Sequence, residues 1–185
     1  MKLLQIEFAL CPSGDLLIQD AKGVRTYREE DRDITDTLFA MIETDYPEAF
    51  AALQDFYAKS RHNLLYYKYK VVHRFLRCNF GRFDNTLDID ARGNMHFEFV
   101  DCPTRGECPY QNVICSPKYN TSLSLREKEV MKLLCSGSTT AEAADKLYLS
   151  EETVKTHRRN AYRRIGVGSL AEFMLYADIH HLFQD

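Results

Sequence analysis

The last third of the chain carries the start and stop signals of three short helices in close succession. Ser124, with Glu127 three positions later, forms a capping box, and Gly137 ends the first helix. A second helix is expected over about residues 140–147, and Ser150 can cap a third. Three short helices joined by tight turns predict a helix-turn-helix arrangement.

The third helix, residues 150–166, is expected to have one buried and one cationic face. The buried face holds three apolar residues at helical spacing: Val154, Ala161 and Ile165. The other face holds three cations and a tyrosine: Lys155, Arg159, Tyr162 and Arg163. A DNA major groove admits a helix of this width, and Arg or Lys contacts to guanine are the commonest specific pairing there. This face is therefore predicted to read base edges, with a methyl or hydroxyl contact from Thr156.

Over roughly residues 123–177 the sequence resembles the LuxR-type (GerE/FixJ/NarL-like) DNA-binding domain. The resemblance is carried by Arg126, Glu127, Glu129, Val130, Gly137, Thr153, Val154, Lys155, His157, Asn160, Gly166 and Val167. It implies a four-helix domain that binds double-stranded DNA, with Lys155, Thr156 and Arg159 facing bases. It also implies that Thr153, His157 and Arg158 lie near phosphates. A fourth helix over about residues 169–180 would form a homodimer interface on DNA.

Three positions depart from the family pattern. Ala143 and Ala161 stand where a larger aliphatic residue is usual, and Leu170 stands where a polar residue is common. These differences predict looser packing between the second and third helices and the loss of one backbone contact. They leave the cationic face unchanged.

Bulk charge does not favour nucleic acid, because the formal net charge is -3 and neither side of residue 120 is basic overall. A DNA-binding interpretation must therefore depend on a local patch. The alternative is that the cations of the third helix only make a solvated surface. The agreement of capping, spacing and family pattern favours DNA.

The chain is expected to divide at the stretch SPKYNTSLS, residues 116–124, which is rich in turn-forming residues. We predict an α+β sensor or interaction domain with a Cys-rich loop over residues 1–116 and a linker over 117–122. An all-α four-helix LuxR-type helix-turn-helix domain is predicted over residues 123–185.

Within the first domain, alternating apolar residues predict a hairpin and a third strand in residues 3–10, 16–20 and 24–28. One helix is expected over about 34–45, and a longer one from Pro47 to a stop at Gly81. The longer helix carries an apolar stripe at helical spacing: Leu65, Tyr69, Val72 and Leu76. A second hairpin is expected from the stretches TLDID and NMHFEFV, residues 86–90 and 94–100.

Four cysteines gather before the predicted boundary: Cys78, Cys102, Cys108 and Cys115. Four thiolates suffice for one tetrahedral structural zinc ion, although no Cys-x2-Cys pair occurs. An iron–sulfur cluster, a thiol–disulfide switch and ordinary thiols without metal stay open as alternatives. Cys11 and Cys135 are expected to be unrelated to this group.

Residues 59–82 hold seven cations and no acid: Lys59, Arg61, Lys68, Lys70, Arg74, Arg77 and Arg82. They predict a cationic helix side. It is either a solvated face or a second contact with DNA backbone or an acidic partner.

Several function classes are disfavoured. Gln5 and Glu7 interrupt any apolar leader, and nothing spans a membrane, so a cytoplasmic protein is expected. No phosphorylatable receiver pattern is found, and the absence of Trp disfavours a lactone sensor. No catalytic motif is present either, so the chain is expected not to be an enzyme.

The prediction is a sequence-specific transcriptional regulator. The alternatives are a sigma-like or adaptor protein acting through RNA polymerase or another protein, or a metal- or redox-responsive switch.

Overall fold

The computed structural model describes residues 5–84, 86–91, 93–180 and 182–183. The chain forms two compact units, one ending at Asn120 and the other beginning at Thr121, here called the N-terminal and C-terminal units. Asn120 belongs to the first unit because its amide and side chain donate to the carbonyls of Asp45 (2.7 Å) and Thr44 (3.1 Å). Each unit is described by itself.

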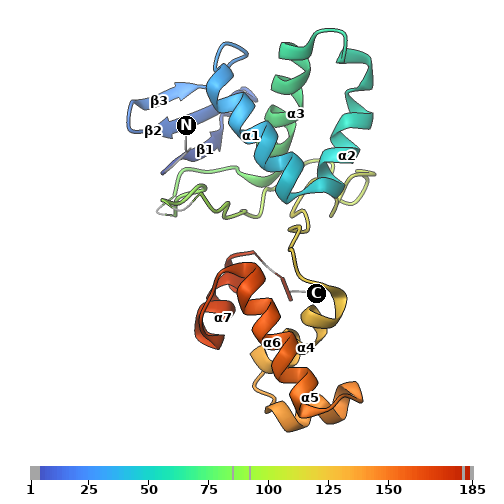
Figure 1. Ribbon diagram of the computed structural model, residues 1–185. Helices are drawn as coiled ribbons and strands as arrows, with labels where there is room; N and C mark the ends of the chain where they lie inside the picture. Colours follow the sequence, from blue (N-terminus) through green and yellow to red (C-terminus); the bar gives the residue numbers. More distant parts are fainter. Residues whose placement is uncertain (1–4, 85, 92, 181, 184–185) are drawn as a thin grey trace. The chain divides into compact units, whose positions relative to one another are not determined.

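The N-terminal unit is α+β, as predicted. Its antiparallel sheet has the order β1-β2-β3, formed by Glu7–Leu10, Leu16–Asp20 and Gly23–Thr26. Phe8 pairs with Ile18, and Ile18 pairs with Arg25. The helices, beside the sheet in Figure 1, are α1 (Arg32–Asp45), α2 (Pro47–Phe56), the 3-10 turn η1 (Ala58–Ser60) and α3 (Leu64–Asn79).

The core of this unit lies between the sheet and helices α1 and α3. The strands contribute alternating residues that are fully buried, among them Phe8, Leu16 and Ile18. Of the predicted apolar stripe on α3, Val72 and Leu76 are fully buried. Leu65, however, is 43% exposed, so the stripe begins further along the helix than its spacing indicated.

The long helix predicted from Pro47 to Gly81 is wrong: α2 and α3 are separate helices. α2 ends at Phe56, and the chain turns before Asn63 caps α3 by accepting a hydrogen bond from the amide of Tyr66 (3.3 Å). An Asn at an N-cap satisfies an amide that would otherwise lack a partner, so it starts a new helix. Apolar periodicity continued across this break and concealed it.

The predicted second hairpin is reduced to a single antiparallel bridge between Ile89 and Met95, and neither of its arms forms a longer strand. Ile89 also bridges to Ile6. Asp88 is buried beside β1 and accepts the backbone N–H of Phe8. This side-chain contact takes an amide that a longer strand pairing would use.

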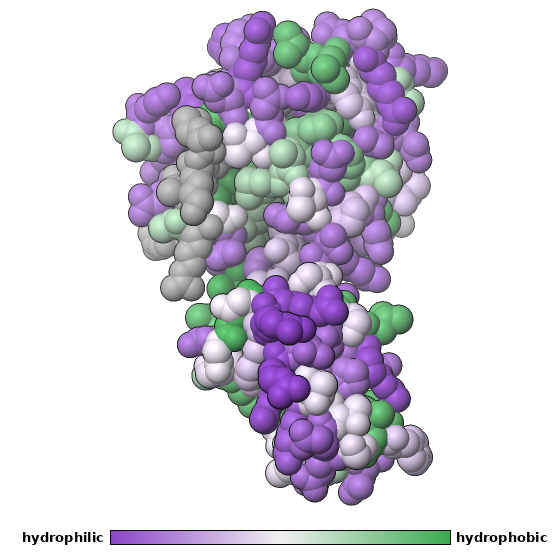
Figure 2. Space-filling view, in the orientation of Figure 1, coloured by the Kyte–Doolittle hydropathy of each residue, from purple (hydrophilic) through white to green (hydrophobic). Residues whose placement is uncertain are grey.

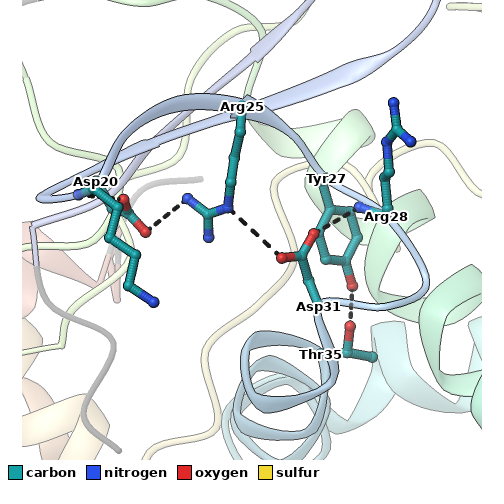
Figure 3. A network of polar contacts seen from close by, with 7 residues as sticks. Asp20, Arg25, Tyr27, Arg28, Asp31 and Thr35 are labelled. Carbon is teal, nitrogen blue, oxygen red and sulfur yellow. Dashed lines mark hydrogen bonds and ion pairs between the residues drawn. The ribbon is translucent and has the colours of Figure 1, made fainter.

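A polar network joins the β2-β3 hairpin to the start of α1 (Figure 3). The Arg25 guanidinium lies between two carboxylates, 2.9 Å from Asp20 and 3.7 Å from Asp31. The hydroxyls of Tyr27 and Thr35, both buried, are 2.6 Å apart. Burial raises the pKa of the Tyr27 phenol, which therefore stays neutral and can act as a donor.

The C-terminal unit has the predicted four helices: α4 (Leu125–Cys135), α5 (Thr140–Leu147), α6 (Glu151–Ile165) and α7 (Leu170–Ile179). Its core is formed by residues from all four helices, including Val130, Ala143, Val154, Ala161 and Phe173, each without exposed surface. Ala143 on α5 and Ala161 on α6 are thus both fully buried. No helix in the described part of the chain is long and apolar enough to cross a bilayer.

Candidate nucleic-acid interface

Helix α6 is a well-delimited rod with capping at both ends. At its start, the Ser150 hydroxyl accepts the amide of Thr153 at 3.1 Å. At its end, Gly166 takes the left-handed conformation, with φ of 81°, and its amide donates to Tyr162 (2.8 Å). Acids lie in its first turn and arginines in its last, which complements the helix dipole. These local contacts fix the direction in which the side chains of α6 project.

One face of α6 is anchored in the C-terminal unit. Val154 and Ala161 are fully buried, as their spacing predicted. Glu127, 2% exposed, completes the α4 capping box with Ser124 and lies 3.2 Å from the Arg164 guanidinium. Burial alone would raise the pKa of Glu127, but the hydrogen bonds from Ser124 and the charge of Arg164 lower it. Glu127 is therefore an ionised residue that connects α4 to the end of α6.

The opposite face of α6 presents Lys155, Arg159 and Arg163, all exposed. Four residues of α-helix rise about 6 Å, so these cations form a row along one side. Lys155 is only loosely paired, with its Nζ 3.9 Å from Glu152, and Arg163 donates to Asn160 at 3.3 Å. Arg159 makes no hydrogen bond or ion pair with any residue that the structure describes. Figure 2 shows strongly hydrophilic residues on the side of this unit where α6 is drawn. The row therefore lies on the surface of this unit.

The other predicted contact residues border this row at intermediate exposure: Thr153, Thr156, His157 and Arg158. Tyr162 differs from them, because its ring packs on the core with its centroid 6.2 Å from that of Phe173. Burial raises the pKa of its phenol. The structure thus brings the three cations together and gives Tyr162 mainly a packing contact.

Three features of this unit were not identified from the sequence. The Arg164–Glu127 ion pair joins segments far apart in the chain and leaves no local pattern. A second capping box, Thr139 with Glu142, begins α5, and its three-residue spacing was a detectable signal. Tyr148, in the turn between α5 and α6, has a left-handed backbone with φ of 54°.

The cysteines are all free thiols of intermediate exposure. Burial raises the pKa of the Cys78 thiol to about 11, and the nearby Cys115 and Cys102 thiols act in the same direction. Arg74 interacts electrostatically with both Cys78 and Cys108. The four predicted thiols therefore lie in one region. Within the described residues, however, no group of three or more His, Cys, Asp or Glu is arranged to hold a metal ion. The zinc ion stays a prediction from the sequence.

The cations of α3 are partly engaged inside the N-terminal unit. Lys68 pairs with Asp36 at 2.6 Å. The Lys70 ammonium lies 5.6 Å from the ring centre of Tyr57, and the Arg74 guanidinium lies 5.3 Å from that of Phe56. These intramolecular contacts occupy part of the cationic side of α3.

Comparison with known proteins finds a family match over the helices that include α6. The model of the family described as "Bacterial regulatory proteins, luxR family" matches residues 121–177. Residues 121–177 form a LuxR-type helix-turn-helix domain. This domain contains α4 to α6 and most of α7, and its family resemblance was predicted from the sequence.

Similar proteins match over limited stretches of the chain. The Fimbriae Z protein of Escherichia coli (strain K12) is 42% identical over 62 residues, which cover 34% of this chain and 30% of that protein. The spore germination protein GerE of Bacillus subtilis (strain 168) is 47% identical over 45 residues, 24% of this chain and 61% of GerE. The CsgBAC operon transcriptional regulatory protein of Escherichia coli (strain K12) is 33% identical over 86 residues, 40% of each chain.

The chain thus spans less than two thirds of the length of each of these relatives. The matching family and the CsgBAC protein are described as regulatory, which agrees with the expectation that the chain is not an enzyme. No solved structure matches the chain at a significant level.

Proposed function

We propose that the protein is a sequence-specific transcriptional regulator that inserts α6 into the major groove of double-stranded DNA. The exposed row of Lys155, Arg159 and Arg163 on an otherwise anchored helix is the observation that carries the proposal. Arg and Lys side chains at this position can donate to guanine O6 and N7. The relatives named as regulators support the same activity.

The contacts divide into two kinds. Lys155, Thr156 and Arg159 read base edges, while Thr153, His157 and Arg158 lie beside phosphates at the borders of the groove. Phosphate contacts release counterions, so the affinity falls as salt rises, whereas base contacts determine the preferred sequence. Arg163 extends the row toward the flanking base pairs or backbone.

A homodimer on DNA is the proposed binding form, with α7 at the interface. Met174 and Leu175 on this helix are 46% and 53% exposed, while Phe173 and Ala177 on its other side are buried. A second copy of α7 would cover these apolar side chains and place two α6 helices on successive turns of the duplex. RNA polymerase is a further proposed partner, reached once the protein is on DNA.

The test is a mobility-shift titration of the full-length chain on a site recovered by selection from genomic fragments. We expect Lys155→Ala and Arg159→Ala each to weaken binding by about 1–3 kcal/mol, or roughly 5- to 150-fold. Lys128→Ala, on α4 outside the row, is the matched control and should bind like the wild type. Circular dichroism checks that the fold is kept. Equal affinity of all four proteins would refute the assignment.

The second candidate, a sigma-like or adaptor protein, makes a different prediction in the same assay. An adaptor needs polymerase or another protein before it engages DNA, whereas a self-sufficient regulator binds the duplex alone. Retention of the selected site by the purified chain without polymerase supports the regulator. Retention only after polymerase is added supports the adaptor.

A further inference from the structure

Two thiols from distant parts of the N-terminal unit lie together at the end of α3. Cys78 occupies the last turn of the helix, and Cys115 lies just before the end of the unit at Asn120. The two thiols are close enough to interact electrostatically, and neither is in a disulfide. The arrangement is independent of the DNA-binding surface on α6.

The Asn79 side chain joins the end of α3, which carries Cys78, to the segment that carries Cys115. Its side chain is fully buried and donates to the carbonyl of Ile114 at 2.8 Å. The same side chain accepts the amide of Ser116 at 2.8 Å. The residues on both sides of Cys115 are thus bound to the neighbour of Cys78, so the two cysteines cannot easily move apart.

Further contacts hold Asn79 and the Cys115 segment in place. Ile114 is 1% exposed and belongs to the core of the unit. The Asn79 side chain also donates to Phe75 one turn earlier, at 2.9 Å, and its backbone carbonyl accepts the amide of Glu98 at 2.9 Å. A disulfide requires such pre-positioning, since its Cβ atoms must lie about 3.5–4.5 Å apart.

We propose that Cys78 and Cys115 are a redox-active pair that forms a reversible disulfide, with a low-molecular-weight disulfide as the oxidant. One protein thiolate attacks a sulfur of the small disulfide, breaks its S–S bond and releases one small thiol. The second protein thiol then displaces the other small thiol from the mixed disulfide. The protons of the two protein thiols end on the two released small thiols. The protein pair loses two electrons, which the small disulfide gains.

The positions of the four cysteines fit a disulfide between Cys78 and Cys115 better than a metal site with four thiolate ligands. In the part of the chain that the structure describes, no three potential ligands are arranged to hold a metal. Cys102 is turned to its own loop, where its sulfur lies 3.3 Å from the Thr104 hydroxyl. Cys78 and Cys115, by contrast, lie in segments that the Asn79 side chain binds together.

Oxidation would fasten the end of α3 covalently to the segment that leads into the DNA-binding unit. The loop between the two cysteines contains Cys102 and Cys108, which stay reduced in this scheme. Closing such a loop restricts the unfolded chain, so the oxidised N-terminal unit should open less readily than the reduced one.

The experiment uses the full-length chain, purified under reducing conditions and then incubated with glutathione disulfide. Remaining thiols are alkylated, and digested peptides are mapped by mass spectrometry. We expect a loss of two hydrogen atoms, a peptide cross-link joining Cys78 to Cys115, and full reversal by dithiothreitol. Cys78→Ser and Cys115→Ser should each abolish this cross-link, while the matched controls Cys11→Ser and Cys135→Ser should form it normally.

Other outcomes would overturn the proposal. A dominant cross-link through Cys102 or Cys108, or glutathione adducts that persist at Cys78 and Cys115, would show that the pair does not close. One equivalent of zinc in the purified protein, protecting all four cysteines from alkylation until a chelator is added, would establish a four-thiolate metal site instead.

Discussion

Replacing Arg164 by Ala is expected to destabilise the C-terminal unit, whereas the same change at the adjacent Arg163 is not. Arg164 lies 3.2 Å from the buried Glu127 carboxylate and also donates to the carbonyl of Ser122 at 3.2 Å. Arg163 is exposed, and it donates a hydrogen bond to Asn160 at the surface. The two residues are neighbours of the same type, so they form a matched pair.

The expected loss of stability depends on which interactions Glu127 keeps in Arg164→Ala. Removing one partner of a buried ion pair costs about 3–5 kcal/mol. Glu127 retains its hydrogen bonds with Ser124, and the Arg164 side chain is 48% exposed, so solvent already screens part of the interaction. We therefore expect a loss of about 1–2 kcal/mol for Arg164→Ala, against less than about 0.5 kcal/mol for Arg163→Ala.

Hydrogen exchange measured by mass spectrometry reports this unit separately, through peptides from α4 and α6. Arg164→Ala should raise exchange in both helices at pH 7, and Arg163→Ala should not. The pKa of Glu127 is lowered in the folded chain, so its contribution is present above the unfolded value of 4.5 and is lost as pH falls through the folded value. The difference between the variants should therefore shrink in acid. Equal protection of the two variants at pH 7 would refute the reasoning.

Three further predictions concern stability. Burial raises the pKa of Asp88 to about 8 from 3.8, so the N-terminal unit should lose up to about 1.4 kcal/mol per pH unit as pH rises between these values. Asp88→Asn should flatten that profile in denaturant titrations, and an unchanged slope would contradict it. Tyr148→Gly should raise the melting temperature, because the left-handed backbone costs a non-glycine residue about 1–2 kcal/mol; a lower value would show that the ring is needed. Gly166→Ala should lower the melting temperature for the same reason, and a neutral result would count against strain at that cap.

The C-terminal unit was predictable from the sequence because its signals are local. Ser124, Ser150 and Gly166 act within one helical turn of their own positions, and the spacing of Val154 and Ala161 depends only on the helix period. The same reasoning identified the exposed row of cations. It could not identify Arg164 as a structural residue, since the position of Glu127 across the bundle is a tertiary property.

The N-terminal unit was predicted less completely, for physical reasons that particular residues illustrate. Asn63 begins a new helix inside a continuous apolar pattern, and only its cap bond distinguishes it from other polar residues. Asp88 takes a backbone amide that strand pairing would have used. Asn79 brings Cys78 and Cys115 together through buried hydrogen bonds that no cysteine spacing encodes.

The central claim is that the exposed side chains of α6 choose the DNA sequence. In vitro selection from random duplexes, carried out in parallel with wild-type protein and Arg159→Ala, tests it most directly. We expect the wild type to enrich a two-fold symmetric motif and the variant to lose preference at one base pair in each half-site, at a cost of about 1–3 kcal/mol. The same motif recovered with equal preference by both proteins, or no enrichment by the wild type, would contradict it.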